Sequence, residues 1–249
     1  MLKVIGIVSG KGGVGKTVTI INLGLALHEI GYEVILTDTD VTASNLGLQL
    51  GFYSFPVTLQ NVLKKEADIF KAIYLHQSGL KIIPSSISMT QLNVNLSKLK
   101  NSLKELDGLM LVDSPPGLNK DALDVINSSD ELIIVTNPEI PAVANATKVI
   151  EVVKSKDKNI LGIVVNRYKG KSYELKPCEI EEICGVPIIA VIPEDSNVKK
   201  SLFKKMPLLT YNPYSPAAIE FRKLAGQLAG KEYQPPRFAF IKRYFRFGK

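Results

Sequence analysis

The stretch Gly10-Lys11-Gly12-Gly13-Val14-Gly15-Lys16-Thr17 decides the fold of this chain. It matches the pattern G-x-x-x-x-G-K-S/T and lies between an apolar run, residues 2–8, that predicts a strand and a helical pattern from about residue 16 to 30. Glycines allow backbone N–H groups to turn inward toward phosphate oxygens, and the start of the helix adds its positive dipole. The stretch therefore predicts a phosphate-binding loop in which Lys16 contacts the outer phosphates and Thr17 binds Mg²⁺.

Outward from this loop, short apolar runs alternate with longer segments of helical period. The further runs that predict strands are 33–37, 80–83, 108–112, 131–135, 160–165 and 187–192. The helical patterns cover 94–104, 121–127, 141–154, 174–184, 198–204 and, from the N-cap pair Ser215-Pro216, up to about residue 229. Several strand runs are apolar throughout, which is typical of strands buried on both faces. We expect an α/β fold with one doubly wound, mostly parallel sheet and helices on both faces.

Composition excludes several classes of site. The chain has 249 residues, of which 45% are hydrophobic and 22% charged, the balance of a globular protein with a substantial core. Cys178 and Cys184 match no C-x-x-C pair, so we expect neither a disulfide scaffold nor a cysteine-built metal site. Two histidines are too few for a three-histidine zinc site. The first ten residues lack a signal-peptide pattern, so we expect a cytoplasmic protein.

The positive charge is concentrated at one end of the chain. The formal net charge is +7, and residues 234–249 hold five cations and no acid, which leaves +2 for residues 1–233. A nearly neutral body argues against a broad nucleic-acid-binding face. We therefore predict a P-loop domain over residues 1–233 and a separate basic tail over residues 234–249.

Lys11 is a second lysine inside the loop, at a position where the general pattern requires none. Residues 9–17, SGKGGVGKT, resemble the deviant Walker A loop of the MinD/ParA family of ATPases, and the whole chain is most similar to the MinD members of that family. The other segments that fall in the family's order are Asp38-Thr39-Asp40, Asn45-Leu46, Asp113-Ser114-Pro115-Pro116-Gly117, Thr136-Asn137-Pro138-Glu139, Asn166-Arg167-Tyr168 and Pro193-Glu194-Asp195. The resemblance implies a Mg²⁺-dependent ATPase that forms a homodimer with ATP sandwiched between its subunits.

The resemblance also implies a role for each site residue. Lys11 reaches the partner's phosphates as an arginine finger does, Lys16 holds its own nucleotide, and Asp40 orients the attacking water. The expected metal residues are Thr17, Asp38 and Asp113, with Asp113 acting through a water molecule. Ordinary acidic turns at the strand ends are the simpler alternative for the three aspartates. Asn45 and residues 113–117 are expected to form switch segments that respond to the γ-phosphate.

The nucleotide is expected to contact two groups of residues. The residues expected to contact the phosphates are Gly10, Lys11, Gly12, Gly13, Val14, Gly15, Lys16 and Thr17. By resemblance, the adenine pocket comprises Asn166, Arg167, Pro193 and Asp195, and the Asn166 amide bonds the base edge. Ordinary strand-end turns remain the alternative for this second group, because nothing in the spacing distinguishes adenine from guanine.

The tail has two chemically distinct sides when it is placed on a helical wheel at about 100° per residue. One side holds Phe238, Phe240, Ile241, Tyr244, Phe245 and Phe247, and the other holds Lys242, Arg243, Arg246 and Lys249. Arg237 is the only cation of the tail that falls on the apolar side. A helix of this kind suits an anionic membrane surface, and MinD proteins end in a similar helix. A disordered basic tail, a docking helix for a protein and a single-stranded nucleic-acid contact are the alternatives.

The function that these features predict is an ATP-dependent dimerisation and membrane-association switch that positions cell division. Such a protein is peripheral on the inner face of the cell membrane and has an activating or effector partner that the sequence does not identify. A ParA-like DNA-partitioning ATPase and a flagellum-placement regulator are the alternatives. A nucleic-acid partner is not expected because of the near-neutral body, and a metal carrier on this scaffold would need closely placed cysteines.

Overall fold

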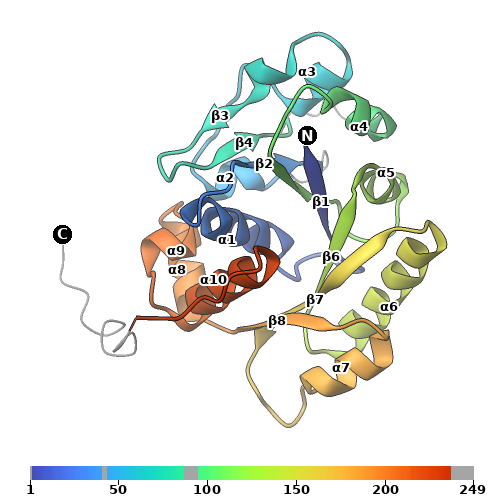
Figure 1. The fold of residues 1–249 in the computed structure, drawn as a ribbon, viewed down its shortest axis with the longest axis vertical. Coiled ribbons are helices and arrows are strands. Elements are labelled where there is room, and N and C mark those ends of the chain that lie inside the picture. The colour runs from blue at the N-terminus through green and yellow to red at the C-terminus, as the bar shows by residue number, and fades with distance from the viewer. Residues whose placement is uncertain (1, 41–43, 87–94, 237–249) are drawn as a thin grey trace.

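The computed structural model describes residues 2–40, 44–86 and 95–236 (Figure 1). The strands are β1 (Lys3–Val8), β2 (Val34–Asp38), β3 (Tyr74–Leu75), β4 (Lys81–Ile83), β5 (Leu109–Asp113), β6 (Glu131–Thr136), β7 (Asn159–Tyr168) and β8 (Ile188–Pro193). The helices are α1 (Lys16–Glu29), α2 (Leu46–Gln49), α3 (Leu59–Leu63), α4 (Leu99–Ser102), α5 (Lys120–Ser128), α6 (Ile140–Ser155), α7 (Pro177–Cys184), α8 (Ser196–Phe203), α9 (Leu208–Tyr211) and α10 (Pro216–Leu228). Among the described residues, η1 (Ile69–Ala72) and η3 (Leu96–Lys98) are 3₁₀ helices.

The strands form a single sheet in the order β3-β4-β2-β5-β1-β6-β7-β8. Every neighbouring pair is parallel except β3 and β4, which are antiparallel at the edge. β1 lies between β5 and β6, so the chain crosses from one half of the sheet to the other around it. The prediction of a doubly wound, mostly parallel sheet is confirmed, and β1 marks the switch point where such sheets bind ligands.

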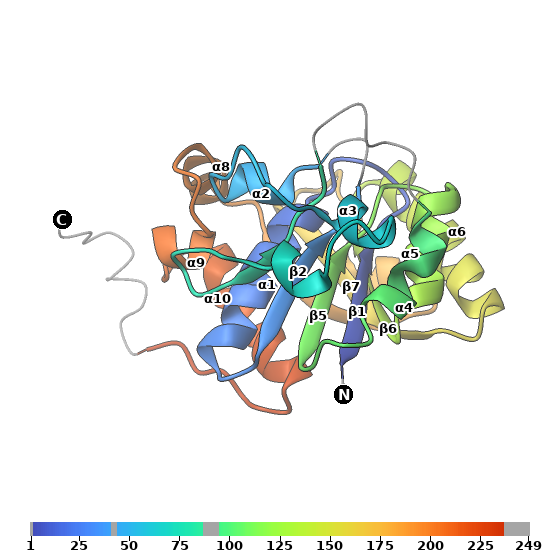
Figure 2. The same cartoon turned by 90° about the horizontal axis from the view of Figure 1, so that it is seen from above.

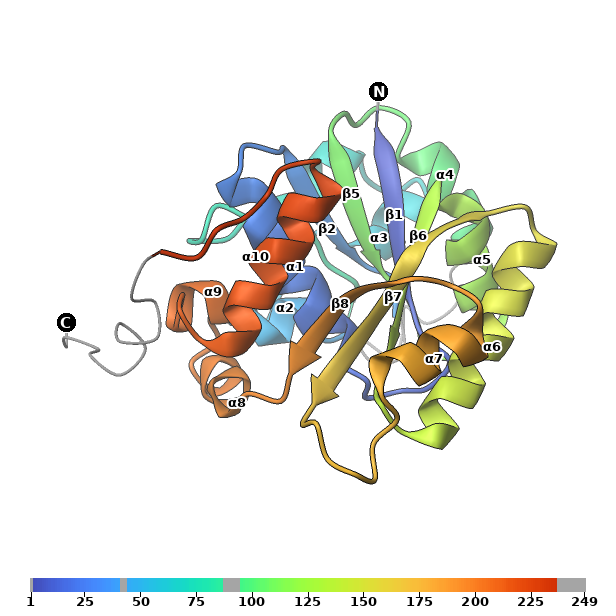
Figure 3. The same ribbon diagram turned by 60° about the horizontal axis from the view of Figure 1, so that its bottom comes forward.

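Helices cover both faces of the sheet, with the strands between them (Figure 2). On one face, α1 and α10 pack against each other and against the strands, and Phe221 of α10 is fully buried there (Figure 3). Arg222 joins the two helices by donating two hydrogen bonds to Glu29, at 2.7 and 2.9 Å. On the other face, α3 to α7 bury a second set of strand side chains, in which Met110 and Val165 take part. The alternation of strand residues between two apolar layers explains why these runs lack polar positions.

The expected elements are present, with some changes of boundary. Ser215 accepts a hydrogen bond from the Ala218 N–H and begins α10 as predicted. Gly31 follows α1 with φ +99°, a left-handed conformation that glycine adopts without strain. The helix expected over 174–184 begins only at Pro177, because proline suits the first turn of a helix and not its interior.

Two parts of the described chain differ from the prediction. The expected helix over 94–104 is a short η3 turn followed by the four-residue α4. α2, α3, η1, β3 and α9 have no counterpart in the prediction because each is five residues or shorter and shows too little periodicity. Residues 237–249 of the basic tail, including Phe238 to Phe247, lie outside the described residues, so the tail helix stays a prediction. Within the described segments, no helix is both long and apolar enough to span a bilayer.

Candidate nucleotide site

The loop of residues 9–17 leaves the carboxyl end of β1 and leads directly into α1. Gly13 and Gly15 have φ values of +77° and +100°, so both require the left-handed freedom of glycine. A Cβ atom on Gly10 would lie 2.2 Å from the Asn145 carbonyl oxygen of α6. The loop is therefore packed against α6, and its glycines are needed for conformation at some positions and for close approach at another.

Lys16 is buried at the first turn of α1. Its Nζ atom donates a hydrogen bond of 2.9 Å to Ser9 Oγ, and Ser9 in turn donates to the Lys11 carbonyl at 2.8 Å. Burial lowers the pKa of Lys16, and the carboxylates of Asp113 and Asp40 oppose that shift. Ser9 thus holds Lys16 beneath the loop, a role that the general motif does not assign to residue 9.

Thr17 and Asp113 meet beside Lys16. Thr17 Oγ1 donates a hydrogen bond of 2.6 Å to Asp113 Oδ2. The second oxygen, Asp113 Oδ1, is buried and has no hydrogen-bond partner among the described residues. Burial, together with the charge of the nearby Asp38, raises the pKa of Asp113 to about 7. A hydroxyl beside a buried carboxylate with an unpartnered oxygen fits Mg²⁺, which is bound through a few oxygen ligands and retained waters.

Asp38 organises the segment after β2. Its carboxylate accepts hydrogen bonds from Ser44 Oγ at 2.8 Å and from the N–H groups of Asp40, Asn45 and Leu46 at 3.0, 3.0 and 3.1 Å. Burial raises the pKa of this carboxyl to about 6, against the effect of these bonds. Both oxygens of Asp38 are therefore occupied by the expected switch segment, and its contribution to metal binding stays a prediction.

One cavity of about 380 Å³ brings most of the predicted phosphate and metal residues together. Its lining comprises Gly12, Gly13, Gly15, Lys16, Thr17, Asp40, Asn45, Asp113 and Pro116, with Val18, Gln49, Ser114, Arg167 and Leu202 at its edges. Asp40 follows β2 and Asp113 ends β5, and the two strands pair in register at Asp38 and Asp113. The parallel register of these two strands is what places both carboxylates at one edge of the sheet.

A second, smaller cavity adjoins the start of α1 and matches the predicted base pocket. It is lined by Asn166, Arg167, Pro193, Glu194 and Asp195, and by the apolar side chains of Val18, Ile192, Val198, Leu202 and Phe221. The apolar lining was missed because it comes from four separate elements that only the tertiary structure brings together.

Two residues of this pocket also hold its walls in place. Asn166 Nδ2 donates a hydrogen bond of 2.7 Å to the Val14 carbonyl, so the amide braces the phosphate loop. Asp195 caps α8 by accepting from the Asn197 N–H at 2.9 Å, and it also accepts from the Ala217 N–H at 3.3 Å. Both side chains hold the walls of the site, and direct contact with a base stays a prediction.

Lys11 lies on the other side of the loop from Lys16. It is exposed and lines a separate polar cavity with Glu139, Glu174, Glu194, Lys169, Arg167 and Asn137. Arg167 borders all three cavities and has φ +59°. Glu139 belongs to a segment that the resemblance included without a role, and Lys169 and Glu174 gave no sequence signal at all. The sequence therefore predicted the lysine of this cavity but not its acidic lining.

Comparisons with known proteins agree with this geometry. Residues 5–208 match the family described as the CobQ/CobB/MinD/ParA nucleotide binding domain. An uncharacterized ATP-binding protein of Methanocaldococcus jannaschii is 37% identical over 98% of this chain and 97% of its own. The septum site-determining protein MinD of Pyrococcus horikoshii, solved with Mg-ADP, is 36% identical over 98% and 100% of the two chains, with a TM-score of 0.87.

A complex from Aquifex aeolicus adds a structure with a protein partner. Its MinC:MinD cell division protein complex contains a chain that is 29% identical over 94% of this chain and 98% of its own, with a TM-score of 0.82. These two structures match this chain in fold over more than nine tenths of its length. This chain therefore belongs to the CobQ/CobB/MinD/ParA family of nucleotide-binding domains, within which MinD proteins are its relatives.

Proposed function

We propose that this protein is a MinD-like ATPase that uses Mg²⁺ and ATP to switch between a free form and a membrane-associated dimer. The observation that carries the proposal is the hydrogen bond from the half-buried Thr17 to the buried Asp113, beside Lys16 at the start of α1. These groups supply a hydroxyl, a carboxylate with an unpartnered oxygen, and an ammonium group around one cavity. That set matches a triphosphate with its metal ion, because each group complements one charge of the complex.

Each residue of the cavity has a definite task in hydrolysis. The loop N–H groups and Lys16 hold the β- and γ-phosphates, and Thr17 and Asp113 hold Mg²⁺, which neutralises charge on those phosphates. Asp40 lines the same cavity and accepts a hydrogen bond from the attacking water, which orients it toward the γ-phosphate. Asp38 binds the backbone of Asp40 and Asn45, so its task is to hold the segment that carries Asp40 in place.

The position of Lys11 supports a role toward a second subunit. Its side chain lines the outer polar cavity and is absent from the lining of the cavity that holds Lys16 and Thr17. An exposed lysine on this rim is free to approach the phosphates of a facing copy, as an arginine finger does. Dimerisation around ATP then completes each site with a cation from its partner.

Membrane association follows from the two tails of such a dimer. Partial burial of six large side chains contributes about 9 kcal/mol, and ordering about twelve residues costs on the order of 12 kcal/mol. Attraction of five cations to anionic lipid adds at most about 5 kcal/mol. One tail therefore binds weakly, whereas two tails on one dimer gain about 10²–10⁴ in avidity. ATP binding thus controls membrane attachment by controlling dimerisation.

The cellular task that fits this switch is the spatial positioning of cell division. A MinD relative from Aquifex aeolicus is found in a complex with MinC, so we infer that a protein partner also binds the ATP-bound dimer of this chain. The switch supplies such a partner with a nucleotide-dependent location on the inner face of the membrane.

The proposal is tested by the mass of the full chain in solution. With Mg²⁺ and a non-hydrolysable ATP analogue, light scattering is expected to give twice the mass found with Mg²⁺ and ADP. Lys16→Ala is expected to remain monomeric, because it loses the nucleotide. A wild-type chain that stays monomeric when saturated with the analogue contradicts the switch.

A further inference from the structure

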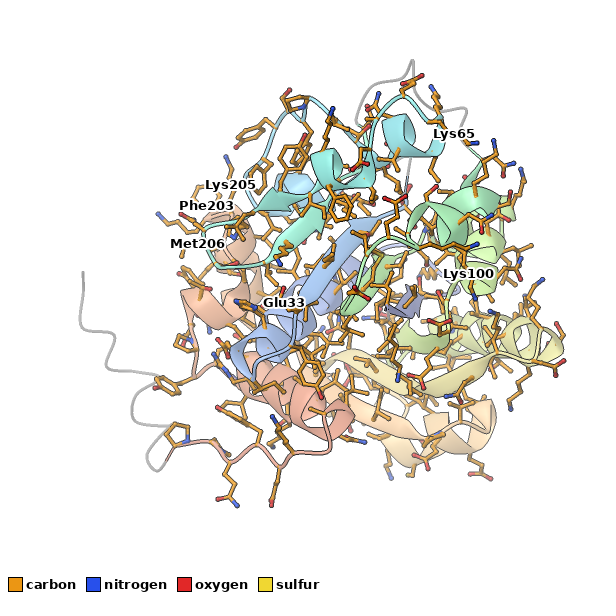
Figure 4. The ribbon with its side chains drawn as sticks, turned by 45° about the horizontal axis from the view of Figure 1, so that its top comes forward. Glu33, Lys65, Lys100, Phe203, Lys205 and Met206 are labelled. Carbon is orange, nitrogen blue, oxygen red and sulfur yellow. The ribbon has the colours of Figure 1, made fainter. Side chains whose placement is uncertain are left out.

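A basic and aromatic corner lies at the end of α8, outside the nucleotide site. We define this α8 corner by Tyr53, Lys200, Phe203, Lys204 and Lys205, all of which are exposed. Phe203 has 82% of its surface exposed and Tyr53 has 61%, the first being the largest value among the described exposed hydrophobic residues. Figure 4 shows Phe203 and Lys205 side by side at this corner. Two exposed aromatic side chains among three lysines form a mixed apolar and cationic surface, and surfaces of this kind occur at interaction sites.

Two segments far apart in the sequence are joined at this corner. Lys205 Nζ lies 4.5 Å from the centre of the Tyr53 ring, a cation–π contact. A Cβ atom on Gly51 would lie 3.3 Å from the Lys205 Cβ, so the two backbones approach each other closely. Lys205 itself has φ +55° in the turn between α8 and α9. These contacts hold Tyr53 beside Lys205, which lies just after α8, so the segment of residues 51–53 and the end of α8 form one platform.

The charge of the platform is of one sign. No aspartate or glutamate occurs in residues 196–219 or in residues 41–65, the two segments that form it. None of the described acidic side chains forms an ion pair with Lys200, Lys204 or Lys205, whereas Lys81 and Arg222 pair with glutamates elsewhere. The lysines of the α8 corner are therefore available to an external anion.

We propose that the α8 corner is a second membrane contact, in which Phe203 enters the headgroup region of an anionic bilayer and the lysines bind lipid phosphates. This inference rests on the proposed membrane association and extends it from the tail to the folded domain. The lipid interface accepts both kinds of side chain, because aromatic rings lie at the headgroup level and cations are attracted to anionic lipid. A DNA backbone would bind the lysines but would leave the Phe203 side chain exposed to water.

The course of the chain agrees with this placement. After α10, the described residues up to 236 run along the side of the molecule that carries α9, as the views in Figures 1, 2 and 3 agree. The predicted membrane tail thus begins on the side of the fold where α8 and α9 lie. The opposite side of α8 lines the base pocket through Val198, Lys199 and Leu202, and these residues are excluded from the α8 corner and from its test.

The absence of tryptophan from the sequence allows a direct test. Phe203→Trp in the full chain places the only tryptophan at the α8 corner. Ile183→Trp is the matched control, because Ile183 is also exposed but lies on α7. Each variant is mixed with Mg²⁺, a non-hydrolysable ATP analogue and vesicles of phosphatidylcholine with about 30% phosphatidylglycerol, with and without brominated phosphatidylcholine. Thermal melting first checks that both variants fold as the wild type does.

The expected result is a blue-shifted emission and quenching by bromine for Trp at 203, and neither change for Trp at 183. In the Phe203→Trp chain, Lys200→Gln and Lys204→Gln are each expected to weaken vesicle binding about fivefold, since a lysine near the surface is worth about 1 kcal/mol. Vesicles of phosphatidylcholine alone are expected to give no shift.

Three results would overturn the inference in different ways. Vesicle binding without quenching at position 203 means that the tail alone inserts, which leaves the proposed function intact and refutes the α8 corner. If the emission of Trp at 203 shifts with duplex DNA but not with vesicles, the α8 corner binds nucleic acid and not a membrane. Failure of both variants and the wild-type chain to bind vesicles refutes the membrane part of the proposed function together with the corner.

Discussion

Asp113 shows how a single residue combines a binding role with a cost to the folded state. Its carboxyl group is buried, accepts one hydrogen bond from Thr17 and leaves Oδ1 without a partner among the described residues. A buried carboxylate with an unpartnered oxygen is unfavourable in the absence of a cation. The position is therefore suited to a bound metal ion and poorly suited to a purely structural role.

The raised pKa of Asp113 predicts a pH dependence of nucleotide binding. The pKa of about 7 means that the carboxyl holds a proton below that pH in the nucleotide-free protein, and Mg²⁺ must displace this proton. We expect Mg²⁺-dependent affinity for a fluorescent ATP analogue to rise up to about tenfold per pH unit from pH 6 to 7 and to level off above it. The measurement is a titration at fixed free Mg²⁺.

Asp113→Asn is the control for this dependence, because the amide has nearly the same shape and does not titrate. Its affinity is expected to be low and to follow only the titration of the nucleotide itself. A wild-type profile that matches that of Asp113→Asn across pH 6 to 8 contradicts the assignment of Asp113 to the metal.

The two lysines of the loop are expected to respond differently to removal. Lys11→Ala should lower ATP hydrolysis by about 10³-fold or more while leaving nucleotide affinity nearly unchanged, if Lys11 acts on the partner's phosphates as an arginine finger does. Lys16→Ala should reduce both, because Lys16 contacts its own nucleotide. Steady-state phosphate release and equilibrium nucleotide binding separate the two effects. Wild-type turnover and dimerisation in Lys11→Ala would disprove the role across the dimer.

At the scale of elements, the phosphate loop depends on its neighbours for its shape. Asn166 at the end of β7 bonds the Val14 carbonyl, and α6 approaches Gly10 so closely that no side chain fits between them. A loop that presents its N–H groups to phosphate gains from such support, because fewer conformations are lost on binding. The precision of the site thus comes from the β7 end and from α6 as much as from the motif.

Gly10 and Gly12 make a matched pair for testing this support. Gly10→Ala would place a methyl group 2.2 Å from the Asn145 backbone, whereas a Cβ on Gly12 meets only Pro116 at 3.8 Å. We expect Gly10→Ala to destabilise the protein by about 1–3 kcal/mol and to weaken nucleotide binding, since the loop or α6 must shift. Gly12→Ala is expected to change stability by less than about 0.5 kcal/mol. Urea unfolding measures the free energy of unfolding of both variants, and an equal loss of stability in the two would contradict the packing argument.

At the scale of the whole molecule, the proposed function couples the nucleotide site to the tail through the number of subunits. Dimerisation around ATP, as proposed, would double the number of tails without changing the affinity of either one. This route predicts that the nucleotide changes membrane affinity more than it changes the fold.

Vesicle binding of the full chain tests that route. With vesicles containing about 30% anionic lipid, we expect the ATP analogue to raise affinity over ADP by about 10²–10⁴. Phe240→Asp with Phe245→Asp should abolish binding, because charges replace apolar side chains on one side of the tail. Phe70→Asp, at an exposed phenylalanine on η1, is the control and should bind normally. Equal co-sedimentation with ADP and with the analogue contradicts the coupling.

The sequence by itself determined the fold class and the centre of the site. The loop of residues 10–17 and the apolar strand runs are local patterns, so the parallel sheet, the start of α1 and the positions of Lys16 and Thr17 followed from them, and the family resemblance added Asp113. Parallel strands place their carboxyl ends at one edge, which is why Asp38 and Asp113, 75 residues apart, lie side by side in the sheet. The family resemblance added the special place of Lys11.

Only the tertiary structure decided which groups surround that centre. The unpartnered oxygen of Asp113, the bond from Asn166 to Val14 and the acidic lining beside Lys11 all depend on contacts between segments distant in sequence. The α8 corner is of the same kind, because Tyr53 and Lys205 meet only in the folded chain. Local patterns record periodicity and turn chemistry, whereas burial and pKa arise from what packs around a residue, and that is settled when the sheet and its helices come together.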